Sequence, residues 1–361
     1  MTTAEELKQF EELANKGDAE AQFRLGRCFA TGDGVTRDVN KAIEWYTKSA
    51  QQNYGPALYN LGVIYSNGRG VDKNVAKGNE YFAKAFPLLL KSAEQGDDFA
   101  QYGLGLCYAY GQGVKQDYAK SFEWHLKAAE QGRRQSQCSV GLCYLRGQGV
   151  KQDYYQAAVW LHKSAEQGYA EAQFNMGECH KNGTGVEQNF ARAAKWYDKA
   201  ARQNYPPAQF EMAKCFAKGQ GVQQHWPSAA FLYHKAAQAG IVEAMYCMGE
   251  VTYHGLGTPK DYNLAVKWYE KAAERGHVKA QVKLAIMYFD DKEIPHDYAK
   301  SFHWAKITAE QGIRESQGLL GMMYGLGRGV AFDKQKAIYW LKKAAVQGFE
   351  PAQELLKELN Y

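Results

Sequence analysis

A pattern that repeats every 36 residues runs through almost the whole chain, and it limits the possible folds more than any other feature. Nine aligned repeats begin at Gly17, Asn53, Gly96, Gly132, Gly168, Asn204, Gly240, Gly276 and Gly312. The second repeat carries seven extra residues, and Pro87 among them predicts a helix that is broken or kinked there. A fixed period of this length is typical of a solenoid, in which each repeat packs only against its neighbours. Positions within a repeat are numbered below from these first residues.

Each repeat predicts two amphipathic helices joined by a tight turn. In the first helix, apolar residues at positions 5, 9, 12 and 13 recur at helical spacing. A Gly-x-Gly-Val turn follows, as at residues 111–114, and its glycines allow the left-handed backbone that ends a helix. Asp117, Asp153, Asp261 and Asp297 then stand where a second helix begins, suited to cap its free N–H groups. The pattern therefore predicts an all-α fold built from helix-turn-helix repeats.

The two ends of the chain differ from the repeats in the way that the exposed ends of a solenoid require. Residues 1–16 predict an N-terminal capping helix that begins with a Thr-x-x-Glu capping box. Residues 348–361 copy a first helix but carry Lys357 where the repeats carry glycine, so no further helix is expected to pack there. We therefore expect two capping helices around nine repeats over residues 17–347.

Two positions are explained by packing between helices. Position 10, in the middle of the first helix, is glycine or alanine in every repeat, which lets a neighbouring helix approach closely at some cost in helix propensity. Tryptophan recurs at position 29 of the second helix, and the sixth repeat has Leu232 there with Trp226 six residues earlier. We predict a structural layer formed by Trp45, Trp124, Trp160, Trp196, Trp226, Trp268, Trp304 and Trp340.

The cysteines are expected to be reduced and structural. Five of the seven stand at position 12, where other repeats place isoleucine, valine or methionine, so cysteine acts there as a small apolar residue. Equivalent positions in stacked helices lie about 10 Å apart, which is too far for a disulfide. Together with a polar N-terminus that lacks an apolar signal segment, these thiols favour a cytoplasmic protein. A chain from which a signal peptide had been removed, or one secreted by a signal-independent route, would look the same.

The repeats resemble those of a known family. Their pattern, Ala-x-x-x-Leu-Gly-x-x-Tyr-x-x-Gly-x-Gly-Val-x-x-Asp-x-x-x-Ala-x-x-Trp-Tyr-x-Lys-Ala-Ala-x-x-Gly, is similar to that of the Sel-1-like repeat (SLR) family, a relative of the tetratricopeptide repeats, and its regularity is similar to that of bacterial members. The resemblance implies a right-handed superhelical solenoid that acts as a scaffold or adaptor. A cysteine-rich subset with paired cysteines in each repeat is described with β-lactam binding. Here the second cysteine of each pair is missing, so that activity is not expected.

Composition and motifs argue against several other classes of function. The net charge of +5 is mild and both signs are interleaved, so we expect no nucleic-acid partner, and no apolar run is long enough to span a membrane. The histidines show no His-x-x-x-His pairing, and the glycine turns lack the Lys-Ser/Thr of a phosphate loop. We therefore predict a monomeric, non-enzymatic protein without a metal or cofactor.

Departures from the repeat locate the predicted binding surface. Positions 4, 8, 11 and 15 of the first helices vary freely and lie on one face, and stacked helix faces are where solenoids bind. We predict a docking patch in the concave groove formed by Val63, Leu106, Tyr110, Leu142, Leu145 and Arg146. A second apolar zone contains Ile286, Phe289, Met322 and Leu326. The alternative is that the side chains at position 11 lean into the core between repeats.

The predicted function is a scaffold that binds a protein or peptide partner in the groove of the solenoid. Two specific roles stay open at this point. One is an intracellular regulator or toxin-immunity protein, and the other is a secreted or translocated bacterial factor that binds a host protein. A rival from another class is a weak hydrolase of the β-lactamase type, as in cysteine-rich relatives, but no nucleophile–base pair supports it.

Overall fold

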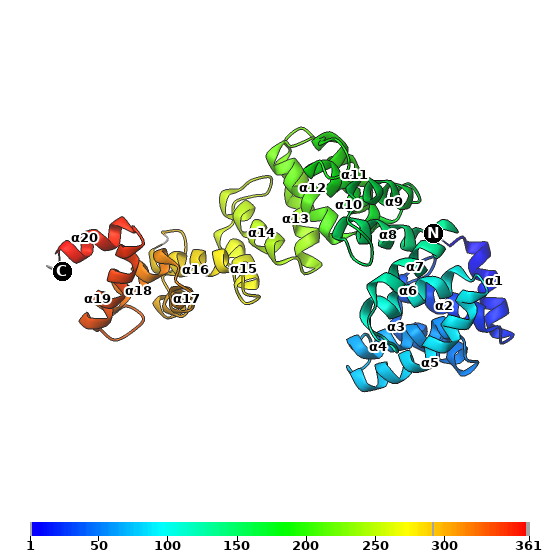
Figure 1. Ribbon diagram of the computed structural model, residues 1–361. Coiled ribbons are helices and arrows are strands. Elements are labelled where there is room, and N and C mark those ends of the chain that lie inside the picture. The colour runs from blue at the N-terminus through cyan, green and yellow to red at the C-terminus, as the bar shows by residue number, and fades with distance from the viewer. Residues whose placement is uncertain (1, 291, 359–361) are drawn as a thin grey trace. The chain divides into compact units, whose positions relative to one another are not determined.

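The computed structural model describes residues 2–290 and 292–358, and all regular elements in those ranges are α-helices. Figure 1 labels the twenty helices from α1 near the N-terminus to α20 near the C-terminus. The chain divides into two compact bodies, residues Met1–Gln188 and Asn189–Tyr361, called the N-terminal and C-terminal bodies below. The all-helical repeat fold that the sequence predicts is confirmed.

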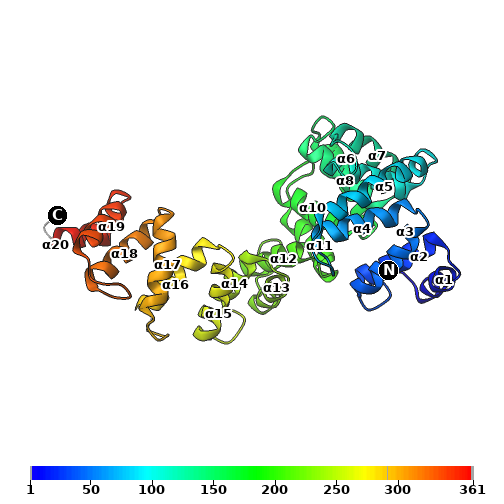
Figure 2. The same ribbon diagram turned by 90° about the horizontal axis from the view of Figure 1, so that it is seen from below.

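The N-terminal body begins with the single helix α1 and continues with helix pairs. Its helices are α1 (Ala4–Asn15), α2 (Ala19–Thr31), α3 (Val39–Gln51), α4 (Gly55–Asn67), α5 (Val75–Glu94), α6 (Asp98–Tyr110), α7 (Tyr118–Glu130), α8 (Arg134–Arg146), α9 (Tyr154–Glu166) and α10 (Ala170–Asn182). Each helix packs against the next one along the chain (Figures 1 and 2). Thr3 and Glu6 form the predicted capping box at the start of α1, because each accepts a backbone hydrogen bond from the other.

The C-terminal body continues the same alternation of first and second helices. Its helices are α11 (Phe190–Arg202), α12 (Pro206–Lys218), α13 (Trp226–Gln238), α14 (Val242–His254), α15 (Tyr262–Ala273), α16 (Val278–Asp290), α17 (Tyr298–Glu310), α18 (Arg314–Leu326), α19 (Lys334–Val346) and α20 (Glu350–Glu358). In α20, Ala352 and Leu356 are buried against α19. The predicted C-terminal cap is therefore helical over residues 350–358, and its last residues, 359–361, lie outside the described ranges.

Helix ends form where the sequence predicts them. Asp117 starts α7 and accepts a hydrogen bond from the backbone N–H of Lys120 at 3.0 Å. Gly111 ends α6 in the left-handed region, with φ of 67°, and Gly113 follows with φ of 73°. A Cβ atom at Gly113 would lie 2.5 Å from the backbone oxygen of Phe82, so this turn packs directly on the backbone of the preceding repeat.

The small residues at position 10 allow the two helices of one repeat to pack closely. A Cβ atom at Gly62 would lie 2.6 Å from the ring of Phe82, and one at Gly141 would lie 2.7 Å from Leu161. Phe82 and Leu161 both stand at position 30 of their repeats, within the second helix, and both are fully buried. The predicted close approach is confirmed, and its partner is the side chain at position 30.

The seven extra residues of repeat two lengthen a helix instead of breaking it. Helix α5 has 20 residues, whereas the second helix of the next repeat, α7, has 13, and Pro87 lies inside α5. Of the two outcomes predicted at Pro87, the break was wrong, and the kink stays a prediction. Proline removes one hydrogen bond from a helix, but Phe82, Ala85 and Leu89 on either side of it are fully buried. This packing stabilises the continuous helix.

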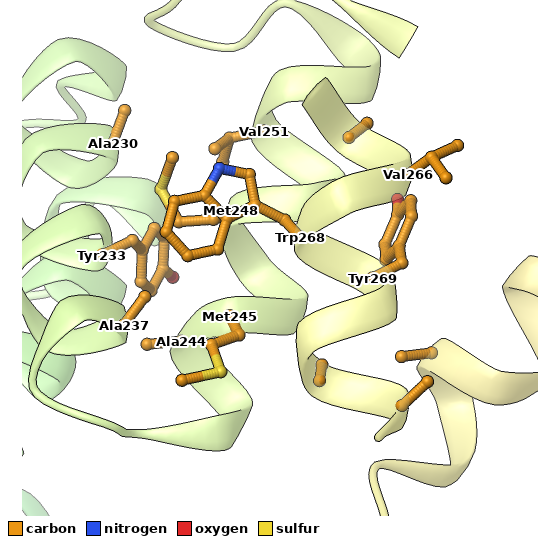
Figure 3. Packing of buried hydrophobic residues seen from close by; sticks show 14 of the residues in the cluster. Ala230, Tyr233, Ala237, Ala244, Met245, Met248, Val251, Val266, Trp268 and Tyr269 are labelled. Atoms are coloured by element: carbon orange, nitrogen blue, oxygen red, sulfur yellow. The ribbon is translucent and has the colours of Figure 1, made fainter. Parts of the chain in front are cut away.

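The tryptophans lie at the edge of the core. Trp196 and Trp268 are buried, whereas the other six are half-buried. A lysine three residues later lies over the ring in several repeats, as for Lys199, whose Nζ is 4.0 Å from the Trp196 ring centroid. Figure 3 shows Trp268 reaching from α15 toward Met248, while the neighbouring Tyr269 belongs to the same buried cluster. The largest fully buried aromatic side chains are those at position 30, one residue after the tryptophan.

Candidate partner-binding site

Two adjoining pockets lie on the first helices of the N-terminal body. The larger has a volume of about 550 Å³ and the smaller about 220 Å³. Both are lined by Leu106 and Tyr110 of α6, so they meet at these two side chains. The two pockets together are called the N-terminal groove below. The larger one falls in the size range of ordinary ligand pockets.

Five of the six residues predicted for the first docking patch line this groove. Val63, Leu106 and Tyr110 line the larger pocket, and Leu142 and Arg146 join Leu106 and Tyr110 in the smaller one. Leu145, the sixth, is half-buried on α8 and is not among the lining residues.

Position 11 was interpreted either as part of a docking surface or as part of the core between repeats, and the exposure of these side chains supports a share in both. Tyr110 is 69% exposed. Val63 and Leu106 are half-buried, and each packs against the hydrophobic core with one side while it lines a pocket with the other. Position 11 therefore contributes to the core and to the groove at once.

The second predicted zone divides differently between surface and core. Ile286 and Leu326 are 47% and 57% exposed. Phe289 is buried, and Met322 packs against the same core cluster as Phe289. Half of this zone therefore belongs to the interior of the C-terminal body.

Three arginines surround one aromatic ring at the wall of the larger pocket. The guanidinium carbons of Arg133, Arg27 and Arg24 lie 3.5, 5.2 and 5.6 Å from the centroid of Phe99. Arg133 Nε donates a hydrogen bond to Asp98 Oδ2 at 2.7 Å. Cations over an aromatic face are attracted by its quadrupole. The positive charges of these three arginines are therefore gathered around the Phe99 ring, at one end of the groove.

Arg27 is the arginine whose charge is not balanced. Arg24 pairs with Glu20 and Arg133 with Asp98, whereas no carboxylate among the described residues lies within ion-pair distance of Arg27. Burial is the main cause that lowers the pKa of its guanidinium, and the nearby charge of Arg133 adds to it. The group still carries its charge at neutral pH, because an arginine stays protonated in proteins.

The sequence analysis missed Arg27, although a signal for it was present. Arg27 stands at position 11 of repeat one, which is the position that supplies Val63, Leu106 and Leu142 in the next three repeats. If the comparison of position 11 had been extended to repeat one, it would have included Arg27. Phe99, at position 4 of repeat three, also lies on the face that the variable positions define.

The smaller pocket contains a buried histidine and a thiol. His125 lines it and is 3% exposed, and its Nδ1 atom has no hydrogen-bond partner. Burial lowers the pKa of His125 to about 4, so the ring is neutral at physiological pH. Burial also raises the pKa of the Cys143 thiol to about 11. A weak base and an un-ionised thiol are poorly suited to nucleophilic catalysis.

A recurring glutamine, which the sequence analysis also missed, ties successive helices together. Gln137 Nε2 donates to the carbonyl oxygen of Ala129 at 3.2 Å, in the last turn of the preceding helix. Gln167 Nε2 donates in turn to Gln137 Oε1 at 2.8 Å and to the carbonyl oxygen of Gly132 at 3.0 Å. The same glutamine pair recurs in repeats one, three and nine. The recurring glutamine at position 6, preceded by alanine or serine in these repeats, was the signal, and the role is structural.

Two further observations concern ligands and membranes. Within residues 2–290 and 292–358, no group of three or more His, Cys, Asp or Glu side chains is placed to hold a metal ion. None of the described helices combines the length and the apolar character that a membrane span needs.

Comparison with known proteins identifies the family. A family model described as Sel1 repeat matches residues 19–54, 55–97, 98–132, 134–169, 170–205, 206–241, 242–277, 278–313 and 314–349. The chain belongs to the Sel1 repeat family. Sel1 repeat proteins are protein-interaction scaffolds. The SLR resemblance that the sequence predicts is thereby confirmed.

Solved structures of other Sel1 repeat proteins have the same fold. A protective antigen present in uropathogenic Escherichia coli strains is 33% identical, with a TM-score of 0.55, over 98% of this chain and 82% of that chain. A Sel1 repeat protein from Oxalobacter formigenes is 29% identical, also with a TM-score of 0.55, over 98% of this chain and 90% of that chain.

A curated relative matches over a short segment. The DAP3-binding cell death enhancer 1 of Rattus norvegicus is 39% identical over 51 residues, which are 14% of this chain and 10% of that protein. The chain therefore spans only a small part of this relative.

Proposed function

We propose that this Sel1 repeat protein is a non-enzymatic scaffold that holds one protein partner in the N-terminal groove. The observation that carries this proposal is the gathering of variable residues from successive first helices around two adjoining pockets. Tyr110 stands where the pockets meet and is 69% exposed. Aromatic side chains and arginines dominate the binding energy of protein interfaces.

The chemistry of the groove supports binding. The larger pocket is lined mainly by aromatic and aliphatic side chains, with amides such as Asn60 and Asn67 among them. An apolar pocket with a few polar groups is the usual form of a binding site. The half-buried side chains at position 11 are also held by the core, so the surface is formed before a partner arrives, which reduces the entropy that binding costs.

The test compares two exposed tyrosines of the N-terminal body. Tyr110→Ser removes an aromatic ring from the groove, whereas Tyr155→Ser removes an equally exposed ring, 66% exposed, from the second helix α9. Both variants should keep the wild-type melting temperature, because an exposed ring contributes little to the core. The measurement is affinity capture from a lysate of the source organism with each form, followed by mass spectrometry and a direct binding assay with the purified candidate.

The expected result is a protein captured by the wild type and by Tyr155→Ser but not by Tyr110→Ser. Truncation of a central aromatic anchor typically costs about 2 kcal/mol or more of binding free energy, which is about thirtyfold in Kd. If every captured protein binds all three forms equally, the groove is not the binding site and the proposal is wrong.

Two specific roles are compatible with a scaffold, and one observation bears on them. The relative from uropathogenic Escherichia coli is a protective antigen. This favours, as a second candidate, a secreted or translocated factor that meets a host protein, beside the intracellular regulator or toxin-neutralising protein. Fractionation of the source cells with an antibody against the chain separates the two roles, because only the factor should appear outside the cell.

A further inference from the structure

With the proposed function as its basis, we infer that the partner enters the larger pocket with an acidic side chain between apolar residues, and that its carboxylate pairs with Arg27. The groove then recognises one specific chemistry, an internal aspartate or glutamate of a protein segment. The inference rests on the charge balance around Phe99 and on the way the two pockets join.

The charge balance leaves Arg27 without a counter-ion. Of the three arginines around Phe99, Arg24 and Arg133 each have a carboxylate within 2.7 Å, whereas Arg27 has none among the described residues within ion-pair distance. Burial of a charge is costly unless a partner compensates it. A carboxylate from a bound segment would supply that compensation in a place where water is partly excluded.

Two carboxylates share another pocket with Arg27, but neither lies within ion-pair distance of its guanidinium. This pocket of about 240 Å³ is lined by Glu6 and Asp33. The Glu6 carboxylate accepts the backbone N–H of Thr3 at 2.7 Å, and the Asp33 carboxylate accepts the hydroxyl of Thr2 at 2.9 Å. Both carboxylates are therefore hydrogen-bonded to Thr2 or Thr3, and Arg27 lines the larger pocket as well.

The walls of the larger pocket select apolar neighbours for the acidic residue. Phe23 and Tyr59 are buried residues whose side chains line it, together with Leu89 and Tyr102. The hydroxyl of Tyr59 donates to Gln112 Oε1 at 2.8 Å, which fixes this wall to the turn of the next repeat. An acidic residue alone would leave this surface exposed to water, whereas flanking aliphatic or aromatic side chains would cover it.

The join between the pockets favours an internal residue over a chain end. The larger and the smaller pocket share Leu106 and Tyr110 as lining residues, and the smaller one is also lined by the exposed Arg146. A segment that binds Arg27 can therefore extend along α6 toward α8. Arg27 also lines the pocket of about 240 Å³, so a chain that pairs with Arg27 has room to continue past it, whereas a free C-terminal carboxylate would leave that pocket empty.

The experiment selects peptides from a random library of 12-residue sequences displayed on phage, with the full chain as bait. Four baits are compared: wild type, Arg27→Gln, Arg69→Gln and Tyr110→Ser. Arg69 is an exposed arginine of the same body that is not among the groove residues, so Arg69→Gln matches the loss of charge. Wild type and Arg69→Gln should enrich Asp or Glu flanked by aromatic or aliphatic residues, and Arg27→Gln should lose the acidic preference.

The best peptide then provides a test that needs no protein variant. It is synthesised with its acidic residue changed to the amide, Glu→Gln or Asp→Asn, and separately with its C-terminus amidated. The side-chain change should weaken binding to the wild type about ten- to a hundredfold, the usual worth of a charged hydrogen bond, and C-terminal amidation should have no effect. A loss of binding on C-terminal amidation alone overturns the inference.

The outcomes separate this inference from the proposed function. Peptides that bind in a Tyr110-dependent way without any acidic preference overturn the inference and leave the scaffold proposal standing. Peptides that bind Tyr110→Ser as well as wild type, or no enrichment with any bait, count against both.

Discussion

The buried ring of His125 makes a prediction about stability at acidic pH. The neutral ring is buried beside Gly105, where a Cβ atom would collide with it, and it stands where other repeats have tyrosine, phenylalanine, leucine or alanine. Burial lowers its pKa from 6.5 to about 4. In the unfolded chain the ring takes up a proton near pH 6.5, whereas in the folded chain it does so only near pH 4.

The sign and size of the effect follow from this difference. Because the unfolded state binds the proton first, the free energy of unfolding falls as the pH drops below 6.5 and stops falling near pH 4. Each unit of pKa difference is worth 1.36 kcal/mol, so the full loss is about 3 kcal/mol and the loss at pH 5 is about 2 kcal/mol.

The variant His125→Leu isolates this contribution from other titrating groups. Leucine fits a site of this kind, because Leu161 occupies the same position against Gly141 in the next repeat. It also removes the unpartnered Nδ1 atom. Urea unfolding at pH 7.5 and 5.0 should show a fall in stability for wild type that exceeds the fall for His125→Leu by about 2 kcal/mol.

A direct measurement accompanies the unfolding data. In an NMR titration, the His125 ring signal, assigned by its absence from His125→Leu, should stay that of a neutral ring at pH 5. An equal pH dependence of both proteins, or a ring that titrates near pH 6.5, would refute the reasoning.

Three further predictions concern stability and can be checked by thermal or urea unfolding. Gly321→Ala should destabilise the chain by about 1–3 kcal/mol, because the new Cβ atom would lie 2.7 Å from Leu341. Gly325→Ala in the same helix should instead stabilise it by about 0.5–1 kcal/mol, because the nearest neighbour of its Cβ atom would be 3.6 Å away. Gln137→Leu should cost about 1–3 kcal/mol, because it removes the hydrogen bonds to Ala129 and Gln167; an unchanged midpoint would contradict the role given to this glutamine. Asp117→Ala should cost about 1 kcal/mol through the lost cap of α7, and Asp117→Asn should cost less; equal losses would show that charge outweighs the hydrogen bond.

The repeat period predicted the helices well because each rule it uses is local. Glycine at position 10, aspartate before the second helix and the Gly-x-Gly turn each act within one repeat or on its neighbour. Pro87 misled the same reasoning, because a local rule for proline ignores the burial of Phe82 and Leu89 around it. Burial on that scale depends on neighbouring repeats, which a local rule does not include.

The candidate site was only partly predictable for a related reason. Apolar residues at position 11 pointed to the face that carries the larger pocket, since position 11 recurs on every first helix. The unbalanced charge of Arg27 could not be read from the sequence, because Glu20 and Asp98 pair with Arg24 and Arg133 instead. Which of several arginines is left unpaired is decided by distances between repeats.

The same geometry explains how a regular solenoid can recognise a specific partner. A period of 36 residues places equivalent side chains on successive first helices, so position 11 forms a row that changes from Arg27 to Val63, Leu106 and Leu142 along the N-terminal body. The core needs only the inner side of these residues, as Val63 and Leu106 show. Their outer side is free to vary in charge and shape without loss of the fold. Under the proposed function, specificity is encoded by the order of side chains along this row, which places the cation Arg27 beside the apolar Val63 and Leu106.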